Sequence, residues 1–178
     1  MVEPIDPEEE LGSFLRQNAG KDWAAEAAED EQQTEALRQR QMNLLSLAED
    51  AGHRGERATA EMSGTVISGP ILTTGTDYVT IQMPEQEADV RLDVATWSFV
   101  EGQGGSPATK SGMSFVGLLK QHASSDSRLR LELTDGSALM GRIKAVGEDH
   151  LRVEDPDGRI AYVPLGSVRS VIRSASRR

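Results

Sequence analysis

The side chains best suited to chemistry in this 178-residue chain are three histidines, a set of aspartates and a group of arginines near the C-terminus. His53, His122 and His150 have no second ligand at a metal-binding spacing such as His-Glu-x-x-His, so we expect structural roles for them. The absence of cysteine excludes thiol catalysis, disulfides and cysteine zinc sites. The histidines therefore predict neither a metal centre nor a catalytic base.

Aspartates in the last third of the chain suggest calcium ligands at first sight: Asp126, Asp135, Asp149, Asp155 and Asp157. Each stands beside a predicted turn, where Asp is common because its side chain hydrogen-bonds the local backbone. The stretch GQGG at 102–105 lacks the Lys-Ser/Thr pair of a phosphate loop, and no Gly-x-Ser-x-Gly motif is present. We expect no enzyme, no cofactor and no small-molecule substrate.

Basic side chains are concentrated near the C-terminus. Residues 126–178 carry ten basic and eight acidic residues, whereas residues 1–62 carry six basic and fifteen acidic ones. Because nucleic-acid affinity depends on Lys and Arg contacts to phosphate, only the last third is a candidate for such binding. The candidate nucleic-acid residues are Arg128, Arg130, Arg142, Lys144, Arg152, Arg159, Arg169 and Arg173. The alternative is an ordinary solvated sheet, since Glu132 and Glu154 interleave with them and no aromatic residue lies among them to stack a base.

The elements that would position these side chains begin with an acidic helical arm over residues 1–52. Asp6-Pro7 is typical of a helix start, and a second helix is expected to end near Gly52. Its apolar stripe includes Leu37, Leu44 and Leu45. These leucines are candidates for docking a protein partner or for packing on the chain's own sheet, and we favour self-packing for residues 37–51.

The chain shows no sign of export or of a membrane span. Its first residues lack a basic segment followed by an apolar one, and eighteen apolar residues never run together. We therefore expect a cytoplasmic protein without membrane contact.

From residue 56 onward the pattern changes from helical to alternating. Residues 56–100 are rich in β-branched side chains, and residues 101–112 are glycine-rich and are expected to form a linker. Residues 113–173 read as a short helix, with Phe115, Leu118 and Leu119 on one face, followed by further strands. Residues 174–178 form a basic tail.

Two stretches of the chain repeat each other. Residues 64–84 align without a gap on residues 136–156 and share six identical residues, three of which are glycines. Average composition would give about one or two such matches. Both copies read as strand, glycine bend, strand, turn and strand, and we expect Pro164 at a strand edge. The sequence therefore predicts a mainly β protein with an N-terminal α region and two tandem five-stranded small barrels.

The segment DGSALMGRIKAVGEDHLRVEDPDGRIAYVPLGSVRSV, with a helix before it, resembles the Sm-like (SH3-like) family of small barrels. The resemblance covers about 50 residues of each copy and implies the same barrel twice. Sm proteins that bind uridine-rich RNA use an Asp and an Asn in the loop between the second and third strands. Here Asp149 is present without an Asn, and the first copy, TGTDYVT, also has none.

Over its whole length the chain is similar to an uncharacterised family of actinobacterial cytosolic proteins that are sometimes labelled Fis family transcriptional regulators. That label implies a helix-turn-helix, but the chain has no pair of short amphipathic helices with a basic second member. We therefore hypothesise a non-catalytic interaction or scaffold module that pairs with itself or with a second protein through exposed strand edges. The alternative is an RNA- or DNA-binding regulatory protein that uses the basic second barrel.

Overall fold

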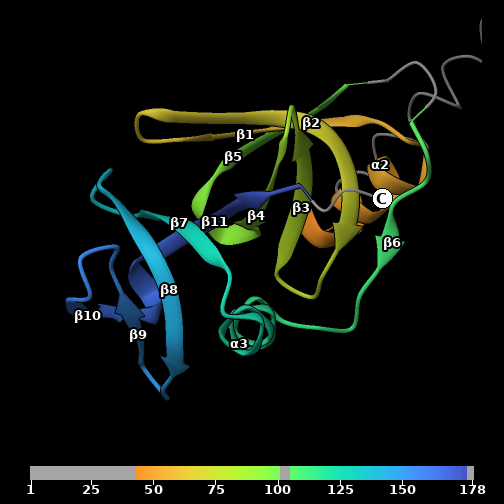
Figure 1. Cartoon of the computed structure of the whole chain (residues 1–178). Coiled ribbons are helices and arrows are strands. Elements are labelled where there is room, and N and C mark those ends of the chain that lie inside the picture. Colours follow the sequence, from red (N-terminus) through yellow and green to blue (C-terminus); the bar gives the residue numbers. More distant parts are fainter. Residues whose placement is uncertain (1–42, 101–104, 176–178) are drawn as a thin grey trace, which may run out of the picture. The chain divides into compact units, whose positions relative to one another are not determined.

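The computed structural model describes residues 43–100 and 105–175 (Figure 1). A compact unit begins at Asn43, so most of the predicted acidic arm, part of the linker and most of the basic tail lie outside the described residues. The elements of the first half are α2 (Leu44–His53), β1 (Arg57–Met62), β2 (Thr65–Thr74), β3 (Tyr78–Met83), β4 (Gln86–Arg91), η1 (Leu92–Val94) and β5 (Thr96–Val100). Those of the second half are β6 (Thr109–Lys110), α3 (Phe115–Ser125), β7 (Arg128–Leu133), β8 (Ala138–Val146), β9 (His150–Glu154), β10 (Ile160–Pro164), η2 (Leu165–Ser167) and β11 (Val168–Ser174).

The strands form one sheet in the order β10-β9-β8-β7-β11-β4-β3-β2-β1-β5. Neighbours along this path are antiparallel, while β6 pairs parallel with β2 off the path. The predicted mainly β class with an N-terminal helix is confirmed. Figure 1 shows β4 and β11 side by side, and their pairing joins the two groups of five strands.

Each group of five strands has the same order. The first reads β5-β1-β2-β3-β4, and the second reads β11-β7-β8-β9-β10, with the last strand of each group beside its first. Among the described strands no pairing closes either group on itself, because the outer edge of β4 is occupied by β11. The two separate barrels predicted from the sequence are therefore not confirmed, and the strands form one open sheet.

The repeated segments share an irregularity in their pairing. Ile71 lies opposite Ile81, and the register then shifts by one residue toward the end of β2. Ile143 lies opposite Val153, and the same shift follows in β8. These positions are equivalent in the gapless alignment of the sequence, so both copies bulge at the same place.

A mid-strand glycine allows the strands to cross closely in both copies. A Cβ placed on Gly69 would lie 1.8 Å from the carbonyl oxygen of Gln82, and one on Gly141 would lie 2.5 Å from that of Glu154. No side chain fits at such distances, so glycine is required by close backbone approach. This is the bend predicted from the sequence.

In both copies the same backbone hydrogen bond holds the 3-10 turn, η1 after β4 and η2 after β10. The amide of Leu92 donates to the carbonyl of Asp77 at 2.9 Å, and the amide of Leu165 donates to that of Asp149 at 2.8 Å. Leu92 and Leu165 are therefore equivalent, with one extra residue before Leu165 in the second copy. Pro164 lies in the edge strand β10, as expected.

Two hydrophobic cores lie against the sheet. The first contains Ala48 and Ala51 of α2 together with side chains of β1 to β4, and the second contains Phe115, Leu118 and Leu119 of α3. Both helices have side-chain caps, since Asn43 accepts from the amide of Ser46 and Ser114 accepts from that of Gly117. The apolar face predicted for α3, with Phe115, Leu118 and Leu119, is confirmed.

The last residues of the expected linker are ordered against the first half. Thr109–Lys110 form β6 beside the end of β2, and the amide of Ala108 donates to the carbonyl of Gly52 at 2.9 Å. The glycine-rich composition of residues 101–112 predicted no strand here, because two residues are too few to show an alternating pattern.

Candidate interaction surfaces

The two ends of the sheet are the edge strands β10 and β5. Neither pairs with another described strand on its outer side. Their sequences, IAYVP and TWSFV, contain no charged residue, although 27% of the chain is charged. Natural edge strands are usually protected from pairing by charges, prolines or a covering element, and within residues 43–100 and 105–175 only Pro164 in β10 gives such protection.

Large apolar side chains are exposed along both edges. The exposed large apolar residues among the described ones are Val66, Val100, Met140, Ile160 and Tyr162. Val100 belongs to β5, whereas Ile160 and Tyr162 belong to β10. Trp97 and Phe99 of β5 stack on each other with ring centroids 6.1 Å apart and are only half-buried against the first core. Trp97 and Phe99 thus pack on the first core, but their edge is not covered by any described strand.

Backbone donors of β10 face the free side. Asp155 donates to Arg159 and Leu165 donates to Asp149, so these pairs are hydrogen-bonded positions of the β9–β10 ladder. Because such positions alternate in antiparallel strands, the N–H groups of Ile160 and Tyr162 point away from β9. The free edge of β10 therefore offers unpaired backbone groups.

The chain contains one completed example of this kind of edge pairing. β4, at the end of the first group in sheet order, pairs with β11, at the start of the second group, over five residue pairs from Ser170–Val90 to Ser174–Gln86. In the shared strand order, β10 is equivalent to β4 and β5 is equivalent to β11. The two free edges are thus the same two kinds of edge that already pair inside the chain.

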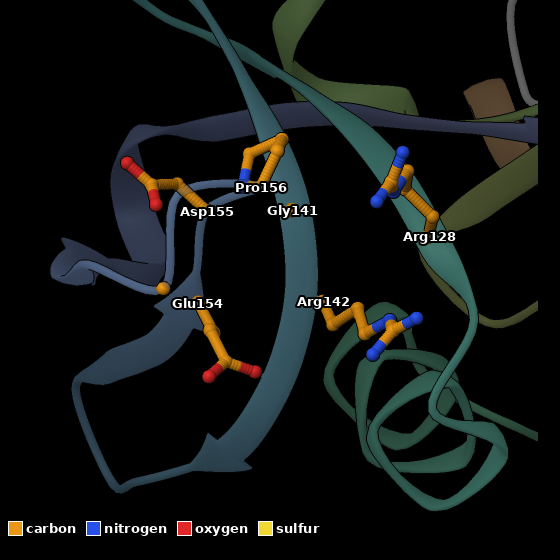
Figure 2. Close-up of a pocket in the computed structure, with 7 residues that line it drawn as sticks. Arg128, Gly141, Arg142, Glu154, Asp155 and Pro156 are labelled. Atoms are coloured by element: carbon orange, nitrogen blue, oxygen red, sulfur yellow. The ribbon is translucent and has the colours of Figure 1, made fainter.

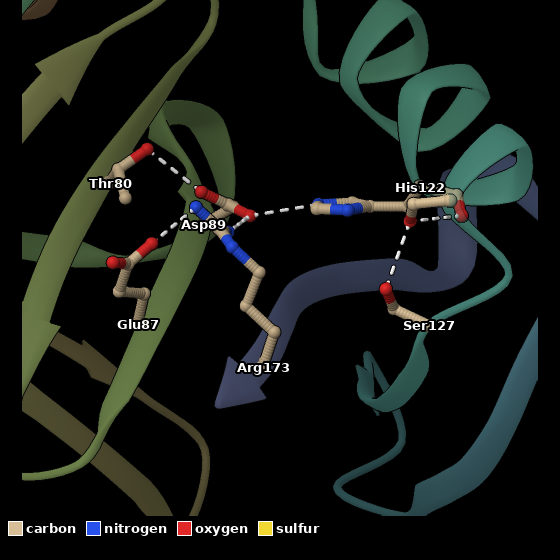
Figure 3. Close-up of polar contacts among 7 residues, drawn as sticks. Thr80, Glu87, Asp89, His122, Ser127 and Arg173 are labelled. Carbon is tan, nitrogen blue, oxygen red and sulfur yellow. Dashed lines mark hydrogen bonds and ion pairs between the residues drawn. The ribbon is translucent and has the colours of Figure 1, made fainter. Parts of the chain in front are cut away.

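A buried polar cluster crosses this internal junction (Figure 3). Asp89 of β4 is fully buried and accepts hydrogen bonds from Thr80 at 2.8 Å and from Arg173 of β11. Its carboxylate also lies 3.2 Å from Nε2 of His122, which reaches it from α3. Arg173 donates in addition to Glu87 at 2.6 Å. The cluster therefore connects β3, β4, β11 and α3 through side chains that are polar and poorly exposed.

Tyr78 connects the halves through apolar contact. It belongs to β3 of the first group but lies in the second core, where its ring centroid is 6.2 Å from that of Phe115. Tyr78 is 2% exposed, and this burial raises the pKa of its phenol above the usual value of 10.0. The folded protein therefore favours the neutral phenol.

The raised pKa of Tyr78 predicts a loss of stability at alkaline pH. The phenol of the unfolded chain ionises first as the pH rises, so the contribution is intact below about pH 10 and declines above it. Denaturant unfolding between pH 8 and 11 should show this decline in the wild type and a smaller one in Tyr78→Phe. Tyr162→Phe, at the exposed tyrosine, is the matched control and should behave as the wild type; equal slopes for wild type and Tyr78→Phe would contradict the prediction.

The eight predicted nucleic-acid residues do not form one surface. Arg169 is 3% exposed, and Arg173 is engaged in the polar cluster by Asp89 and Glu87, so neither is available to a ligand on the surface. Both residues lie on β11, which pairs with β7 on one side and with β4 on the other, so little of either side chain is exposed to a nucleic acid. Alternation alone predicted an outward side chain.

Other members of the predicted set are already paired with acidic residues. Nε of Arg130 lies 2.6 Å from Glu132, and Arg142 lies 3.7 Å from Asp126. Nζ of Lys144 lies 3.0 Å from Asp126, and this hydrogen bond lowers the pKa of Asp126 and raises that of Lys144. Within the described residues, Arg128, Arg152 and Arg159 remain exposed without an ion pair: they are the free cations of the set.

Arg128 and Arg142 line a hollow of about 200 Å³ at the bend of β8 (Figure 2). The hollow is also lined by Gly141, Glu154 and Asp155. Figure 2 shows the two arginines on one side of it and the two carboxylates on the other. The hollow is polar and shallow, without a nucleophile or a metal-binding set.

The predicted partner-docking leucines divide between described and undescribed residues. Leu37 lies outside the described residues, whereas Leu44 and Leu45 are half-buried and pack against the first core. They also line a hollow of about 390 Å³ with Leu92 and Asp93. The contact of Leu44 and Leu45 with their own sheet is the self-packing that the sequence analysis favoured.

Sequence reasoning missed two sets of residues. Asp89 and His122 were not expected together, because the residues of the cluster are separated by 33 and 84 positions. Tyr162 was not included with the arginines, although it lies directly opposite Arg152 on β9. The alternating patterns of residues 150–154 and 160–164 were the sequence signal from which the pairing of Tyr162 with Arg152 could have been inferred.

Further observations limit the chemistry of the described part. No group of three His, Asp or Glu side chains in residues 43–100 and 105–175 is arranged to hold a metal ion. No helix among these residues is both long and apolar enough to cross a bilayer. Comparison with known proteins finds no family model and no curated sequence that matches the chain.

Proposed function

We propose that this protein is a non-catalytic interaction module that associates through its sheet edges, with β10 of one chain pairing with β5 of another. The observation that carries the proposal is that both edge strands are uncharged and apolar while their equivalents, β4 and β11, already pair inside the chain. The two segments with the shared geometry described above are proposed to be tandem copies of one Sm-like unit. The same unit would then be joined within and between chains by one kind of contact.

The side chains at the two edges fit such pairing. Ala161 and Val163 of β10 face the second core, and half-buried Trp97 and Phe99 lie on the core side of β5. On the opposite face, Ile160, Tyr162 and Val100 are exposed. Pairing would bury apolar surface on both faces of the new junction and would satisfy the free backbone groups.

The contact between unlike edges determines the kind of assembly. A β10–β5 junction is heterologous, because two different edges meet. Each chain that joins therefore leaves a new free edge, and the assembly either closes into a ring or grows as a filament. Sedimentation velocity at protein concentrations up to about 100 µM should therefore show association, and a closed ring would appear as one discrete species. A strictly monomeric protein over this range would contradict the proposal.

The contribution of the β10 backbone can be tested at Ile160. Its N–H faces the free side, so Ile160→Pro removes an edge donor without removing a hydrogen bond to β9. We expect Ile160→Pro to be monomeric and folded. The matched variant Ile160→Ala removes the exposed side chain but retains the N–H, and it should still associate. Equal association of Ile160→Pro and wild type would show that β10 is not the interface.

A further inference from the structure

The internal junction between β4 and β11 indicates how the free edges β10 and β5 would align on each other. In that junction Asp89 lies opposite Val171, and Glu87 lies opposite Arg173. Because β10 is equivalent to β4 and β5 is equivalent to β11, each of these pairs has an equivalent at the free edges. The residues that form the equivalent pairs can be identified strand by strand.

The equivalence of β10 and β4 is fixed by the 3-10 turns that follow them. The first residue of η1 comes directly after β4 and the first residue of η2 directly after β10, and the amides of both make the same hydrogen bond to the residue before β3 or β9. Counting back three residues from these positions makes Tyr162 the equivalent of Asp89. Counting back five makes Ile160 the equivalent of Glu87.

The equivalence of β5 and β11 is fixed by the strands β1 and β7 beside them. Ala60 of β1 and Leu131 of β7 are equivalent, because each lies opposite the same aligned position of the repeat in β2 or β8. On the other side of β1 and β7, Ala60 lies opposite Trp97, and Leu131 lies opposite Val171. Trp97 is therefore the equivalent of Val171.

The register of the internal junction thus places Tyr162 of one chain opposite Trp97 of a partner chain, a second copy of this protein. Two residues further along β5, Phe99 is the equivalent of Arg173 and would lie opposite Ile160. Residues directly opposite each other in antiparallel strands share a face of the sheet. The exposed side chains of β10 would therefore each cover a half-buried aromatic ring of β5.

Trp97 is held in place for such a contact. Its Nε1 donates to the carbonyl oxygen of Leu92 at 3.0 Å, and its ring lies at 11° to the ring of Phe99. The two rings therefore form a fixed apolar platform along the free edge. In the single chain Tyr162 is 68% exposed and Ile160 is 38% exposed, so pairing would remove apolar surface of both strands from water.

Pro164 does not obstruct this register. The five internal pairs end at Val90, so Arg91, the last residue of β4, lies beyond them. Pro164 is the last residue of β10 and is equivalent to Arg91. The N–H that Pro164 lacks is therefore not needed in this register, whereas a register shifted toward Pro164 would lose a hydrogen bond.

We propose that β10 and β5 of neighbouring chains pair in this register, with Tyr162 packed on Trp97 of the partner chain. Ile160 then covers Phe99 of the partner chain in the same way. This register presupposes the edge association proposed above and adds the residues that select one edge over another. An edge with Asp89 in place of Tyr162 would bury its carboxylate on an aromatic ring without an arginine beside it, and an unpaired buried charge is strongly destabilising. The aromatic residues therefore keep the junction between chains distinct from the charged junction within a chain.

The register is tested by disulfide formation in the full-length chain, which has no cysteine of its own. Ala161 would lie opposite Ser98 as a non-hydrogen-bonded pair, with Cα atoms about 4.5 Å apart, which suits a disulfide. An oxidised mixture of Ala161→Cys and Ser98→Cys proteins should therefore give a disulfide-linked dimer. Ala161→Cys mixed with Thr96→Cys is the register control. These two residues would be diagonal neighbours about 7–8 Å apart and should crosslink at least about tenfold more slowly.

The aromatic contact is tested by sedimentation of variants at Tyr162. Tyr162→Ala should raise the dissociation constant for association at least about tenfold, whereas Tyr162→Phe, which retains the ring, should associate as the wild type. Val66→Ala is the matched control, because the Val66 side chain is 66% exposed on β2, a strand that is paired on both sides. It should leave association unchanged.

The register is overturned if the wild type associates but Ala161→Cys crosslinks no faster with Ser98→Cys than with Thr96→Cys. It is also overturned if Tyr162→Ala associates as tightly as Val66→Ala. In both cases the edge association proposed above can still hold. A wild type that stays monomeric, or a cysteine variant that crosslinks equally well by itself because like edges meet, refutes the β10–β5 association and the register together.

Discussion

Asp89→Ala is expected to destabilise the protein by about 3–5 kcal/mol, the usual cost of removing one partner from a buried ion pair. The Asp89 side chain is fully buried and bonds Thr80, His122 and Arg173. Without its carboxylate, Arg173 would be left with Glu87 alone at a poorly exposed position. The junction between β4 and β11 would thus lose its main polar connection, and urea denaturation should report the loss directly.

The matched control for Asp89→Ala is Asp93→Ala. Asp93 also pairs with an arginine, Arg91 at 2.6 Å, but its side chain is 65% exposed. Because water screens such a pair, its removal should cost less than about 1 kcal/mol. Similar losses for the two variants would mean that the buried cluster does not hold the junction. A variant Asp89→Asn, which keeps the shape but not the charge, should lie between them.

Gly69→Ala is expected to cost at least about 3 kcal/mol, because overpacking against a backbone atom cannot be relieved by a side-chain rotation. The new Cβ would lie 1.8 Å from the carbonyl oxygen of Gln82 and 3.1 Å from Cγ2 of Ile81. Strands β2 and β3 would have to separate where they cross. Gly141→Ala, with 2.5 Å to the carbonyl of Glu154, should show the same effect in the second half with a smaller magnitude.

Gly166→Ala is the control for these glycine variants. A Cβ at Gly166 meets no atom within 4 Å, and its backbone φ is not in the left-handed region. The variant should therefore remain within about 0.5 kcal/mol of the wild type. Thermal unfolding of the three alanine variants gives the comparison. A Gly69→Ala protein as stable as Gly166→Ala would show that β2 and β3 do not approach each other this closely.

The free energies expected for these variants relate to the proposed assembly. The β4–β11 junction inside the chain can be a model for a junction between chains only if it is stable. Asp89 and Arg173 are the residues that strengthen it. Across β10 and β5 the equivalent cluster is absent among the described residues, since neither strand carries a charge. We therefore expect the contact between chains to be weaker and reversible, while the contact within the chain is permanent.

Local features of the fold could be predicted because they depend on neighbouring residues. Gly69 and Gly141 indicated bends, and Phe115, Leu118 and Leu119 indicated a helix with one buried face. The likeness of residues 64–84 to residues 136–156 indicated that the two copies share their bends and turns. These signals are visible in a single sequence because each bend, helix or strand restricts the residue types that can form it.

The buried cluster and the burial of Arg169 could not be predicted in this way. An alternating pattern shows which side chains share a face, but it does not show whether that face meets solvent or another element. Asp89 and Arg173 are buried because β4, β11 and α3 come together from distant parts of the chain. Tyr162 was overlooked for the converse reason, since an aromatic residue on an alternating strand is normally expected inside.

By itself, the sequence determined a mainly β protein with an N-terminal helical region, two glycine-bent, similar segments, a short helix before the second of them and no evident catalytic or metal-binding motif. The tertiary structure decided that the outer edge of β4 is filled by β11, that the sheet stays open at β10 and β5, and that Tyr162 shares a face with arginines. The physical reason is range: bends, caps and alternation are set within a few residues, whereas the partner of an edge strand depends on which distant edge is free.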